Sequence, residues 1–361
     1  MKNILISKSL DEMKKFFCAE HIRTPLTVSF DITRSCNMHC MHCYNKRSPL
    51  PDYLDSYDKV YSVVKKLCDL QVYEVTISGG EPLVSPFFLD FVAEVKRQGM
   101  CTRIITNGIL IDKYYKRLSE ILTKNDTIQY SIDEALRTRN RQRYLTMHEK
   151  QICYHNLRKL SAVFKNVIVN ITPTKFNQYE IFDIVKDAVD FGARYISATP
   201  YIPMGGSAAD SAIPDYGLLL DVESRVSTFC AERHIIYFGG ISGHACQQKC
   251  DSSAQDIKKD AIETIEKERG CDAGNFNFHI SNDGRIYPCV FMQFDDFVIS
   301  EIDKASDSIL HDFNNFSDLL NISLPNKCIF CSRLNDCHGG CIGLIYDRYG
   351  SLDFSDPRCF S

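Results

Sequence analysis

The segment Leu26–Cys43, LTVSFDITRSCNMHCMHC, joins a β-branched run to three closely spaced cysteines. Its first part, Leu26–Ile32, has the composition of a strand. Cys36, Cys40 and Cys43 follow it, separated by three and then two residues. Cysteines grouped this closely are typical of a bound metal ion or an iron–sulfur cluster. The segment therefore predicts a strand whose carboxyl end leads into a metal-binding loop.

Similar runs recur along the chain and predict five further strands: Val72–Ser78, Cys101–Thr106, Thr127–Asp133, Asn166–Thr172 and Tyr195–Tyr201. Between them lie segments with helical periodicity, such as Asp58–Leu70, Phe87–Gly99 and Tyr179–Gly192. Alternating strands and helices predict an α/β fold with a parallel sheet and right-handed crossovers. Periodicity leaves a doubly wound sheet and an incomplete barrel both open. In either case, ligands collect at the carboxyl ends of the strands.

Composition limits the function classes. The chain has 361 residues, a formal charge of −4 and 17 cysteines. The slightly acidic balance gives no electrostatic basis for a nucleic-acid partner or an anionic membrane. No stretch is long and apolar enough to cross a bilayer, and the first residues lack the layout of a signal peptide, so we expect a cytoplasmic protein. In a reducing compartment, clustered cysteines bind metal more often than they form disulfides.

A second motif, SGGEP at Ser78–Pro82, ends the second predicted strand. Its two glycines would let the backbone approach a ligand closely, and Glu81 offers a carboxylate. Three cysteines leave one iron of a four-iron cluster without a protein ligand, and an open coordination site is typical of a catalytic metal. A mixed zinc site that includes His39 and His42 is the alternative for the cysteine triplet.

Together, the Cys36-xxx-Cys40-xx-Cys43 triplet and the Gly79–Pro82 motif resemble those of the radical S-adenosylmethionine (SAM) enzymes. The resemblance covers Leu26 to about Tyr201 and implies a partial (β/α)6 TIM-like barrel. It implies a 4Fe-4S cluster whose fourth iron is chelated by the amino and carboxylate groups of SAM. An electron from a donor such as flavodoxin or ferredoxin then cleaves SAM into methionine and a 5′-deoxyadenosyl radical, which abstracts a hydrogen atom from the substrate.

The resemblance also implies which residues contact SAM. The motif Gly79, Gly80, Glu81 and Pro82 would hold the methionine amine, and the candidates at the next two strand ends are Asn107, Ser131 and Asp133. The segment after the fourth strand departs from the "SLDG…HD…RG" run of many relatives. By spacing, Arg141 or Arg143 fits best as a clamp for the SAM carboxylate. A solvated basic face is the alternative for each arginine.

A second group of cysteines lies near the end of the chain, and its spacing resembles the SPASM extension of radical SAM enzymes. Its members are Cys271, Cys289, Cys328, Cys331, Cys337, Cys341 and Cys359. The resemblance implies two auxiliary 4Fe-4S clusters, three clusters in all. Cys328, Cys331, Cys337 and Cys359 would hold the distal cluster, and Cys271, Cys289 and Cys341 the proximal one. A pair of zinc knuckles is the alternative.

The proximal set lacks a fourth cysteine. The proximal cluster would then be open to substrate, or Cys246 or Cys250 would complete its ligand set. Alternatively, one of these two would act catalytically by donating a hydrogen atom, or they are structural thiols. The expected organisation is an N-terminal segment over 1–25, the barrel over 26–238, a bridging segment over 239–270 and a small Cys-rich SPASM domain over 271–361. This last part has few long apolar runs, so its folding is expected to depend on metal.

The sequence discriminates partly between the family's reactions. Sulfatase-maturing relatives carry an aspartate after the second SPASM cysteine, whereas Val290 and Phe291 follow Cys289 here. Few residues precede Leu26, so any leader recognition is expected within the enzyme or on a separate protein. The loop Tyr201–Asp210 looks like the Pro-x-Gly-Arg-Ala segment of peptide- and cofactor-maturing relatives, with Gly206 in place of the arginine.

Three hypotheses follow for the function. The first is a radical SAM/SPASM oxidoreductase that crosslinks or oxidises a residue of a ribosomally made precursor peptide. The second is a radical SAM dehydrogenase or epimerase of a small polar metabolite of the sugar or aminoglycoside type. The third is a non-catalytic, cysteine-rich zinc or electron-carrier protein.

Overall fold

The computed structural model describes residues 25–45, 51–138, 142–205, 207–243, 273–319 and 324–359. The chain divides into two compact units. The first comprises the described residues 25–35, 51–104 and 273–319, and the second comprises 36–45, 105–138, 142–205, 207–243 and 324–359. Each unit is built from strands and helices.

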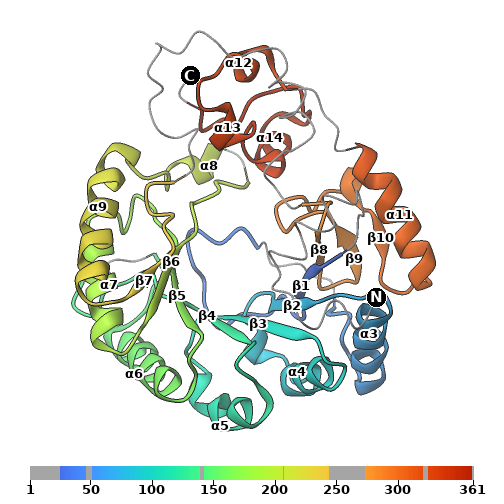
Figure 1. Ribbon diagram of the computed structural model, residues 1–361, viewed down its shortest axis with the longest axis horizontal. Helices are drawn as coiled ribbons and strands as arrows, with labels where there is room; N and C mark the ends of the chain where they lie inside the picture. Colours follow the sequence, from blue (N-terminus) through green and yellow to red (C-terminus); the bar gives the residue numbers. More distant parts are fainter. Residues whose placement is uncertain are drawn as a thin grey trace. The chain divides into compact units, whose positions relative to one another are not determined.

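The first unit has its strands in the order β10-β9-β8-β1-β2-β3 (Figure 1). Strand β1 pairs in parallel with β2 on one side and with β8 on the other, and β2 pairs in parallel with β3. Strands β8, β9 and β10 are joined antiparallel. The bounds are β1 (Thr27–Asp31), β2 (Glu74–Ser78), β3 (Cys101–Thr106), β8 (Asn277–Ile280), β9 (Arg285–Tyr287) and β10 (Ser300–Glu301).

Three helices belong to this unit: α3 (Tyr57–Asp69), α4 (Phe88–Arg97) and α11 (Ser306–Leu319). Helix α3 begins where the Ser56 side chain accepts a hydrogen bond from the Lys59 backbone. Its buried residues lie at helical spacing, so one face packs inward: Val60, Val63, Val64 and Leu67. Short 3-10 turns cover Pro82–Val84 and Asp295–Phe297.

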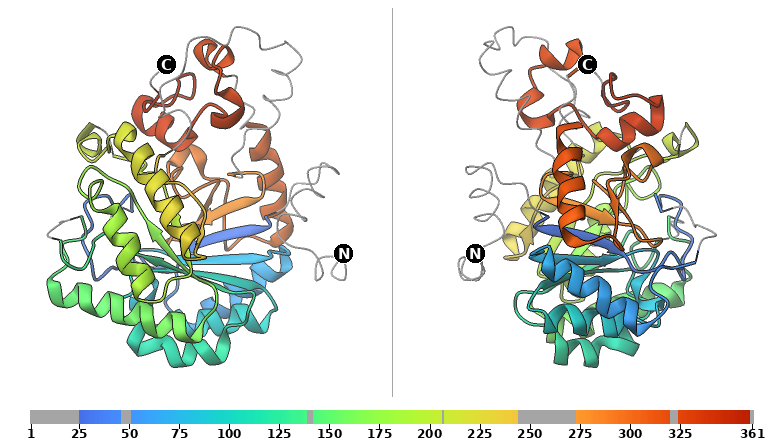
Figure 2. Two further views of the ribbon diagram at one scale, coloured as in Figure 1. Left: turned by 60° about the vertical axis from the view of Figure 1, so that its left-hand side comes forward. Right: turned by 90° about the vertical axis from the view of Figure 1, so that its right-hand side faces the viewer.

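The second unit has four parallel strands in the order β4-β5-β6-β7, covered by helices that follow one another in the chain (Figure 2). Helix α6 begins with a capping box in which Thr146 and Glu149 satisfy each other's backbone groups. The bounds are β4 (Thr127–Ser131), α5 (Ile111–Ile121), α6 (Met147–Val163), β5 (Val167–Ile171), α7 (Ile181–Asp190), β6 (Tyr195–Ala198), α8 (Ser207–Asp210), α9 (Tyr216–Glu232) and β7 (Ile236–Tyr237).

The end of the chain adds three short helices to the second unit: α12 (Asn326–Ile329), α13 (Leu334–Cys337) and α14 (Ile342–Tyr349). Leu324, Cys328 and Leu334 form a buried cluster there, with Ile329 packed against it. This is a small apolar cluster by the standards of a folded domain.

The α/β class with a parallel sheet core is confirmed. Each of the six predicted strands contains an observed one, β1 to β6, and the predicted helices correspond to α3, α4 and α7. Strands β8 to β10 were not predicted, although Asp283–Gly284 is a hairpin signal and Gly284 adopts a positive φ of 87° between β8 and β9. The described residues 273–319 belong to the first unit and 324–359 to the second, while the boundaries set at 25, 238 and 270 stay predictions.

Candidate active site

The three cysteines predicted as cluster ligands lie on one loop, residues 36–43, which we call the cysteine loop. Cys36 and Cys40 are partly buried, and Cys43 is exposed. Burial raises the pKa of the Cys40 thiol to about 11, a rise opposed by Arg143 and reinforced by Asp133, Cys43 and Cys36. Since the other two thiols act electrostatically on Cys40, the loop brings all three together.

Residues between the cysteines anchor the loop to the ends of neighbouring strands. The Asn107 side chain, which follows β3, donates from Nδ2 to Oδ1 of Asn37 at 2.8 Å. The Met41 backbone N–H donates to the Gln142 carbonyl at 2.9 Å. The loop is therefore held by segments that come from two different strand ends.

A buried ion pair lies beside the cysteine loop. Arg143 donates to Oδ2 of Asp133 from Nε at 2.7 Å and from Nη2 at 2.6 Å. Although burial opposes it, the Asp133 carboxylate raises the pKa of Arg143 above its ordinary value. His42 Nε2 lies 3.3 Å from the same carboxylate oxygen, and burial lowers the pKa of His42 to about 4, assisted by the charge of Arg143. The imidazole is thus neutral near pH 7.

The Gly79–Pro82 motif is laid against the backbone that leads into the cysteine loop. Gly80 N–H donates to the Thr33 carbonyl at 2.8 Å, and Glu81 N–H donates to the Ser35 carbonyl at 2.9 Å. A Cβ on Gly80 would lie 2.3 Å from the Ser35 oxygen, and Gly79 has a φ of 134°. In the structure these glycines allow the close approach of this neighbouring backbone, and that they also contact SAM stays a prediction.

Glu81 is buried, and its Oε1 accepts a hydrogen bond from the Leu83 backbone at 3.2 Å. This bond caps the short turn that begins at Pro82. Ser131 is the last residue of β4, half-buried, and pairs in register with Asn170 of β5. That Glu81, Ser131 and their neighbours contact SAM stays a prediction, and Arg141 lies outside the described residues.

The structure brings four cysteines of the second group together in the second unit. The pKa of Cys328 is raised to about 11, mainly by burial. Cys359, Cys337 and Cys331 contribute to this rise, and Lys327 opposes it. These four thiols are the set that the SPASM resemblance implies for the distal cluster.

Cys341 lies in the same unit, where its backbone N–H donates to Oδ2 of Asp356 at 2.8 Å. Asp356 is in turn buried with Arg358, whose Nη2 lies 2.7 Å from the same oxygen. Cys289 belongs to the first unit and is partly buried. The remaining predicted residues of the proximal set, Cys246, Cys250 and Cys271, lie outside the described residues.

Sequence reasoning missed several residues that support these thiols. His42 was considered only as a zinc ligand, and Gln142, Asp356 and Arg358 were not considered. The DPRC sequence around Cys359 was a usable signal, since an acidic and a basic residue two apart stand next to a cysteine. The Gln142 and His42 contacts join residues about a hundred positions apart and have no local signal.

Buried polar groups also gather at the carboxyl end of β1 in the first unit. Asp31 accepts a hydrogen bond from Ser78 Oγ at 2.9 Å and lies 3.6 Å from His279 Nε2. Nδ1 of His279 lies 3.0 Å from Ser29 Oγ. Burial lowers the pKa of His279, which opposes protonation despite the neighbouring Asp31.

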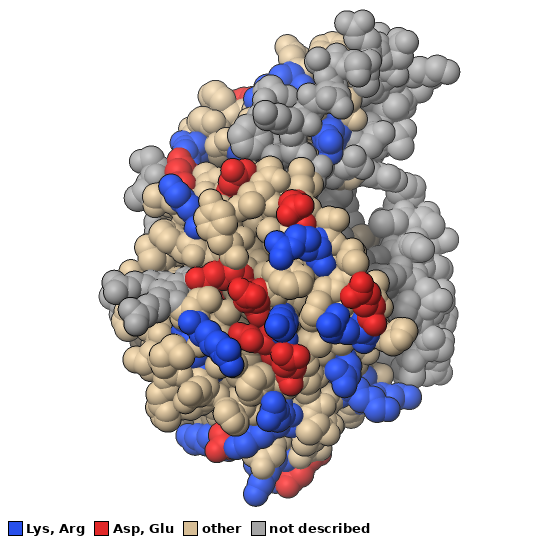
Figure 3. Space-filling view, turned by 90° about the vertical axis from the view of Figure 1, so that its left-hand side faces the viewer, with Lys and Arg blue, Asp and Glu red and all other residues tan. Residues whose placement is uncertain are grey.

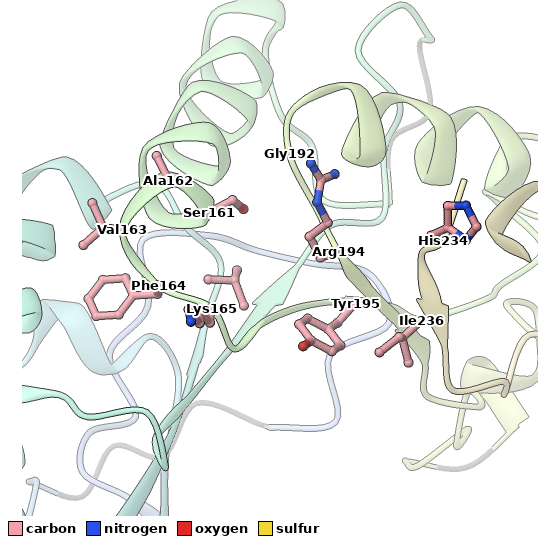
Figure 4. A pocket seen from close by; sticks show the side chains of 11 residues that line it. Ser161, Ala162, Val163, Phe164, Lys165, Gly192, Arg194, Tyr195, His234 and Ile236 are labelled. Atoms are coloured by element: carbon pink, nitrogen blue, oxygen red, sulfur yellow. The ribbon is translucent and has the colours of Figure 1, made fainter. Parts of the chain in front are cut away.

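A hollow of about 450 Å³ lies elsewhere in the second unit, at the amino ends of β5, β6 and β7 (Figure 4). Phe164, Tyr195 and Ile236 contribute apolar surface, and Lys165, Arg194 and His234 are basic. Asp133 and the cysteine loop lie at the carboxyl ends of strands, so this hollow is separate from the candidate site.

Acidic and basic side chains of the described residues are interspersed on the face shown in Figure 3. No helix among the described residues is long and apolar enough to cross a membrane. The expected absence of nucleic-acid and membrane partners stays a prediction.

Comparison with known proteins identifies the domain that carries the cysteine loop. Residues 30–189 match the family model described as the radical SAM superfamily. These residues form a radical SAM domain. A radical SAM domain binds SAM and a 4Fe-4S cluster, which makes this chain an enzyme.

Relatives match far beyond this domain. Mycofactocin maturase MftC of Mycobacterium ulcerans is 23% identical over 346 residues, which cover 94% of this chain and 89% of MftC. Streptococcus suis SuiB bound to S-adenosylmethionine has a TM-score of 0.72 at 18% identity and covers 96% of this chain and 80% of its own. The structure of anSMEcpe with bound AdoMet and Cp18Cys peptide has a TM-score of 0.64 at 16% identity. The match covers 91% of this chain and 92% of the anSMEcpe chain. The structural likeness shows the fold, and the partial-barrel expectation is confirmed.

The donor set of the cysteine loop fits an iron–sulfur cluster. Three thiols lie together, and His42 contacts Asp133 rather than joining them in a zinc site. Among the residues that the structure describes, no three His, Cys, Asp or Glu side chains are close enough to bind a single metal ion. Cluster ligands need not converge in that way, because each binds a different iron.

Proposed function

We propose that this chain is a radical SAM enzyme with auxiliary clusters that crosslinks or oxidises a residue of a ribosomally made precursor peptide. The observation that carries the proposal is the similarity to a maturase, MftC, along nearly the whole of both chains. SuiB, which shares the fold, has also been solved bound to a precursor peptide, SuiA. Similarity over such a length includes the Cys-rich tail, which lies beyond the radical SAM domain.

In this proposal, the Cys-rich tail holds iron rather than serving as a purely structural appendage. The support is the group formed by Cys328, Cys331, Cys337 and Cys359, in which the other three thiols lie close enough to act electrostatically on Cys328. Four cysteines are the usual ligand set of a 4Fe-4S cluster. We assign them to a distal auxiliary cluster.

A proximal cluster would use Cys271, Cys289 and Cys341. Cys246 or Cys250 would complete it or donate a hydrogen atom to the substrate. The enzyme would then hold three clusters in all.

Hydrogen bonds within this chain support the roles proposed around the cysteine loop, and the resemblance to radical SAM enzymes supports the proposed SAM contacts. Bound SAM and its cluster supply the 5′-deoxyadenosyl radical that removes a hydrogen atom from the peptide. Gly80 and Glu81 hold the backbone before Cys36 and so fix where the cysteine loop begins. Asn107 and Asp133 hold the start and the end of that loop through Asn37 and His42. The chain's own residues thus position the three thiols, while Glu81, Pro82, Ser131, Asp133 and Arg141 or Arg143 are the proposed SAM contacts.

We further propose that a flavodoxin or ferredoxin supplies the electron and that the enzyme acts in the cytoplasm. Clustered reduced thiols suit a reducing compartment, which supports the proposed location. The test is whether purified flavodoxin with its reductase replaces dithionite in SAM cleavage. Cleavage with dithionite but with neither protein donor would contradict this assignment.

The function is tested with anaerobically reconstituted protein, SAM, dithionite and synthetic peptides encoded by short reading frames beside this gene. Mass spectrometry should find a peptide that loses two hydrogen atoms while one 5′-deoxyadenosine and one methionine form per SAM consumed. The matched control is a variant with serine at Cys328 and Cys331, which should still cleave SAM but should not complete the peptide product. SAM cleavage with a sugar or aminoglycoside oxidised in place of any peptide would contradict the peptide assignment.

A further inference from the structure

One buried ion pair contacts both segments between the three cysteines. Met38 lies between Cys36 and Cys40, and its sulfur lies 4.0 Å from Nη1 of Arg143. His42 lies between Cys40 and Cys43, and its Nε2 lies 3.3 Å from Oδ2 of Asp133. The pair therefore touches the cysteine loop twice, once from its cation and once from its anion.

The positions of both charges are set by the surrounding fold. Oδ1 of Asp133 accepts the Thr172 backbone N–H at 2.6 Å, and Asn177 Nδ2 donates to the Asp133 carbonyl at 3.3 Å. The Arg143 backbone N–H donates to Oε1 of Glu134 at 2.7 Å. The segment after β5 thus fixes the Asp133 carboxylate, Glu134 fixes the Arg143 backbone, and the ion pair holds the guanidinium beside the loop.

Glu134 is itself anchored from helix α6. The Lys150 ammonium lies 3.0 Å from Oε2 of Glu134, and both side chains are fully or almost fully buried. Tyr154 Oη donates to the Glu134 carbonyl at 3.1 Å. This support is more than a solvated basic segment needs, and it holds Arg143 in one place.

We propose that Arg143 and Asp133 are positioning residues that set the charge beside the cluster held by Cys36, Cys40 and Cys43, and so its reduction potential. This inference rests on the proposed function of the cysteine loop. A cation at close range favours the reduced, more negative cluster, and an anion disfavours it, with little screening where the charges are buried. Because arginine stays protonated at all working pH values, its charge is constant.

This role differs from a clamp on the SAM carboxylate. Nε and Nη2 of Arg143 already donate to Asp133, so one of the two edges of the guanidinium is in use, and Nη1 on the other edge faces the Met38 sulfur. A clamp matters only when SAM is bound, whereas a fixed charge acts on the cluster without SAM. The potential of the SAM-free cluster therefore separates the two roles.

The experiment is a redox titration of anaerobically reconstituted full-length protein without SAM, followed by electron paramagnetic resonance. A variant with alanine at all three loop cysteines provides the spectrum of the other clusters, which is subtracted. We expect Arg143→Gln to shift the midpoint potential of the SAM-binding cluster to more negative values and Asp133→Asn to shift it to more positive values. Arg143→Lys keeps the charge and should stay near the wild type. Arg117→Gln is the control, since Arg117 pairs with Glu120 on an exposed face of α5.

Equal potentials in Arg143→Gln, Asp133→Asn and wild type would overturn the inference, as would shifts of the same sign in both. If Arg143→Gln loses the cluster, the test uses Arg143→Lys and the double variant Arg143→Gln/Asp133→Asn instead. The midpoint potential of each should then be closer to that of the wild type than the midpoint potential of Asp133→Asn is. Weakened SAM binding in Arg143→Gln at an unchanged potential would assign the clamp instead. Failure of the wild type to bind this cluster or cleave SAM would refute the proposed function, which is a distinguishable result.

Discussion

Replacing Arg358 with methionine is expected to destabilise the chain around Cys341 far more than the loss of one hydrogen bond would. Arg358 and Asp356 are 2% and 1% exposed, and Arg358 donates to both carboxylate oxygens of Asp356. Removing one partner of a buried ion pair leaves an uncompensated charge, which costs about 3–5 kcal/mol. The carboxylate would keep two backbone donors, the N–H groups of Cys341 and of residue 358, which do not replace a cation.

The chain offers a matched control in Arg348→Met. Arg348 donates to both carboxylate oxygens of Asp210 in the same unit, but the two side chains are 21% and 36% exposed. Water can solvate the remaining charge there, so the expected cost is within about 1 kcal/mol. The assay is amide hydrogen exchange over residues 324–359 in the reconstituted protein, because local opening reports this region without requiring global two-state unfolding. A cost of about 3–5 kcal/mol corresponds to exchange that is a hundredfold to a few thousandfold faster.

The pH dependence gives the same prediction a second check. Burial opposes ionisation of Asp356, but Arg358 and the Cys341 backbone hold its pKa below its ordinary value of 3.8. In the wild type, this carboxylate therefore stabilises the fold above that pH and loses the contribution as the pH falls through its lowered pKa. Without Arg358, burial should raise the pKa of Asp356 above 3.8. The loss of protection in Arg358→Met relative to the wild type should therefore become smaller as the pH is lowered from about 7.5 to about 5.5.

Adding Asp356→Asn to Arg358→Met should restore most of the protection, because the amide oxygen still accepts the Cys341 N–H without a charge. Equal effects of Arg358→Met and Arg348→Met would refute the reasoning. A double variant as unprotected as the single one would refute it as well.

Three further changes test the cluster assignments and the close contacts. Alanine at all three cysteines of the cysteine loop should abolish 5′-deoxyadenosine formation and remove about four irons, while the auxiliary iron stays. Serine at Cys328 and Cys331 should remove the distal cluster and lower the melting temperature, because metal binding there is coupled to folding; an unchanged iron content would contradict this. Gly80→Ala should lower cluster occupancy, because its Cβ would lie 2.3 Å from the Ser35 oxygen. Gly99→Ala, which has open space around its Cβ, should leave iron content unchanged.

The fold was predictable where its signals are local. A strand such as β5 or a helix such as α3 carries its own periodicity, so each predicted strand segment contained its strand and the predicted helices agree with the observed ones to within two residues. Strand β8 shows the limit. Its four residues carry too short a pattern, and it exists because it pairs in parallel with β1, about 250 positions away in the chain. Such pairing depends on the whole sheet and leaves no mark in a short window.

In the candidate site, too, the features with a local signal could be predicted and the contacts between distant segments could not. The cysteines could be predicted because their spacing is itself the chemical signal, and a thiol needs only neighbours within a few residues to be noticed. The glycines at Gly79 and Gly80 were also noticed, but what they approach was not. A glycine indicates a close contact without naming the partner, and here the partner is the Thr33–Ser35 backbone.

Arg143 shows why the supporting contacts could not be predicted. Its spacing suggested a carboxylate partner, and the structure supplies one, but from Asp133 within the same chain. That choice depends on Asp133 being fixed by the Thr172 N–H, and so on the register in which β4 pairs with β5. A shift of one residue in that register would turn the end of β4 to the other face of the sheet and separate the pair from the cysteine loop. The motif therefore specifies the ligands, while the pairing of strands distant in sequence determines which charges surround them.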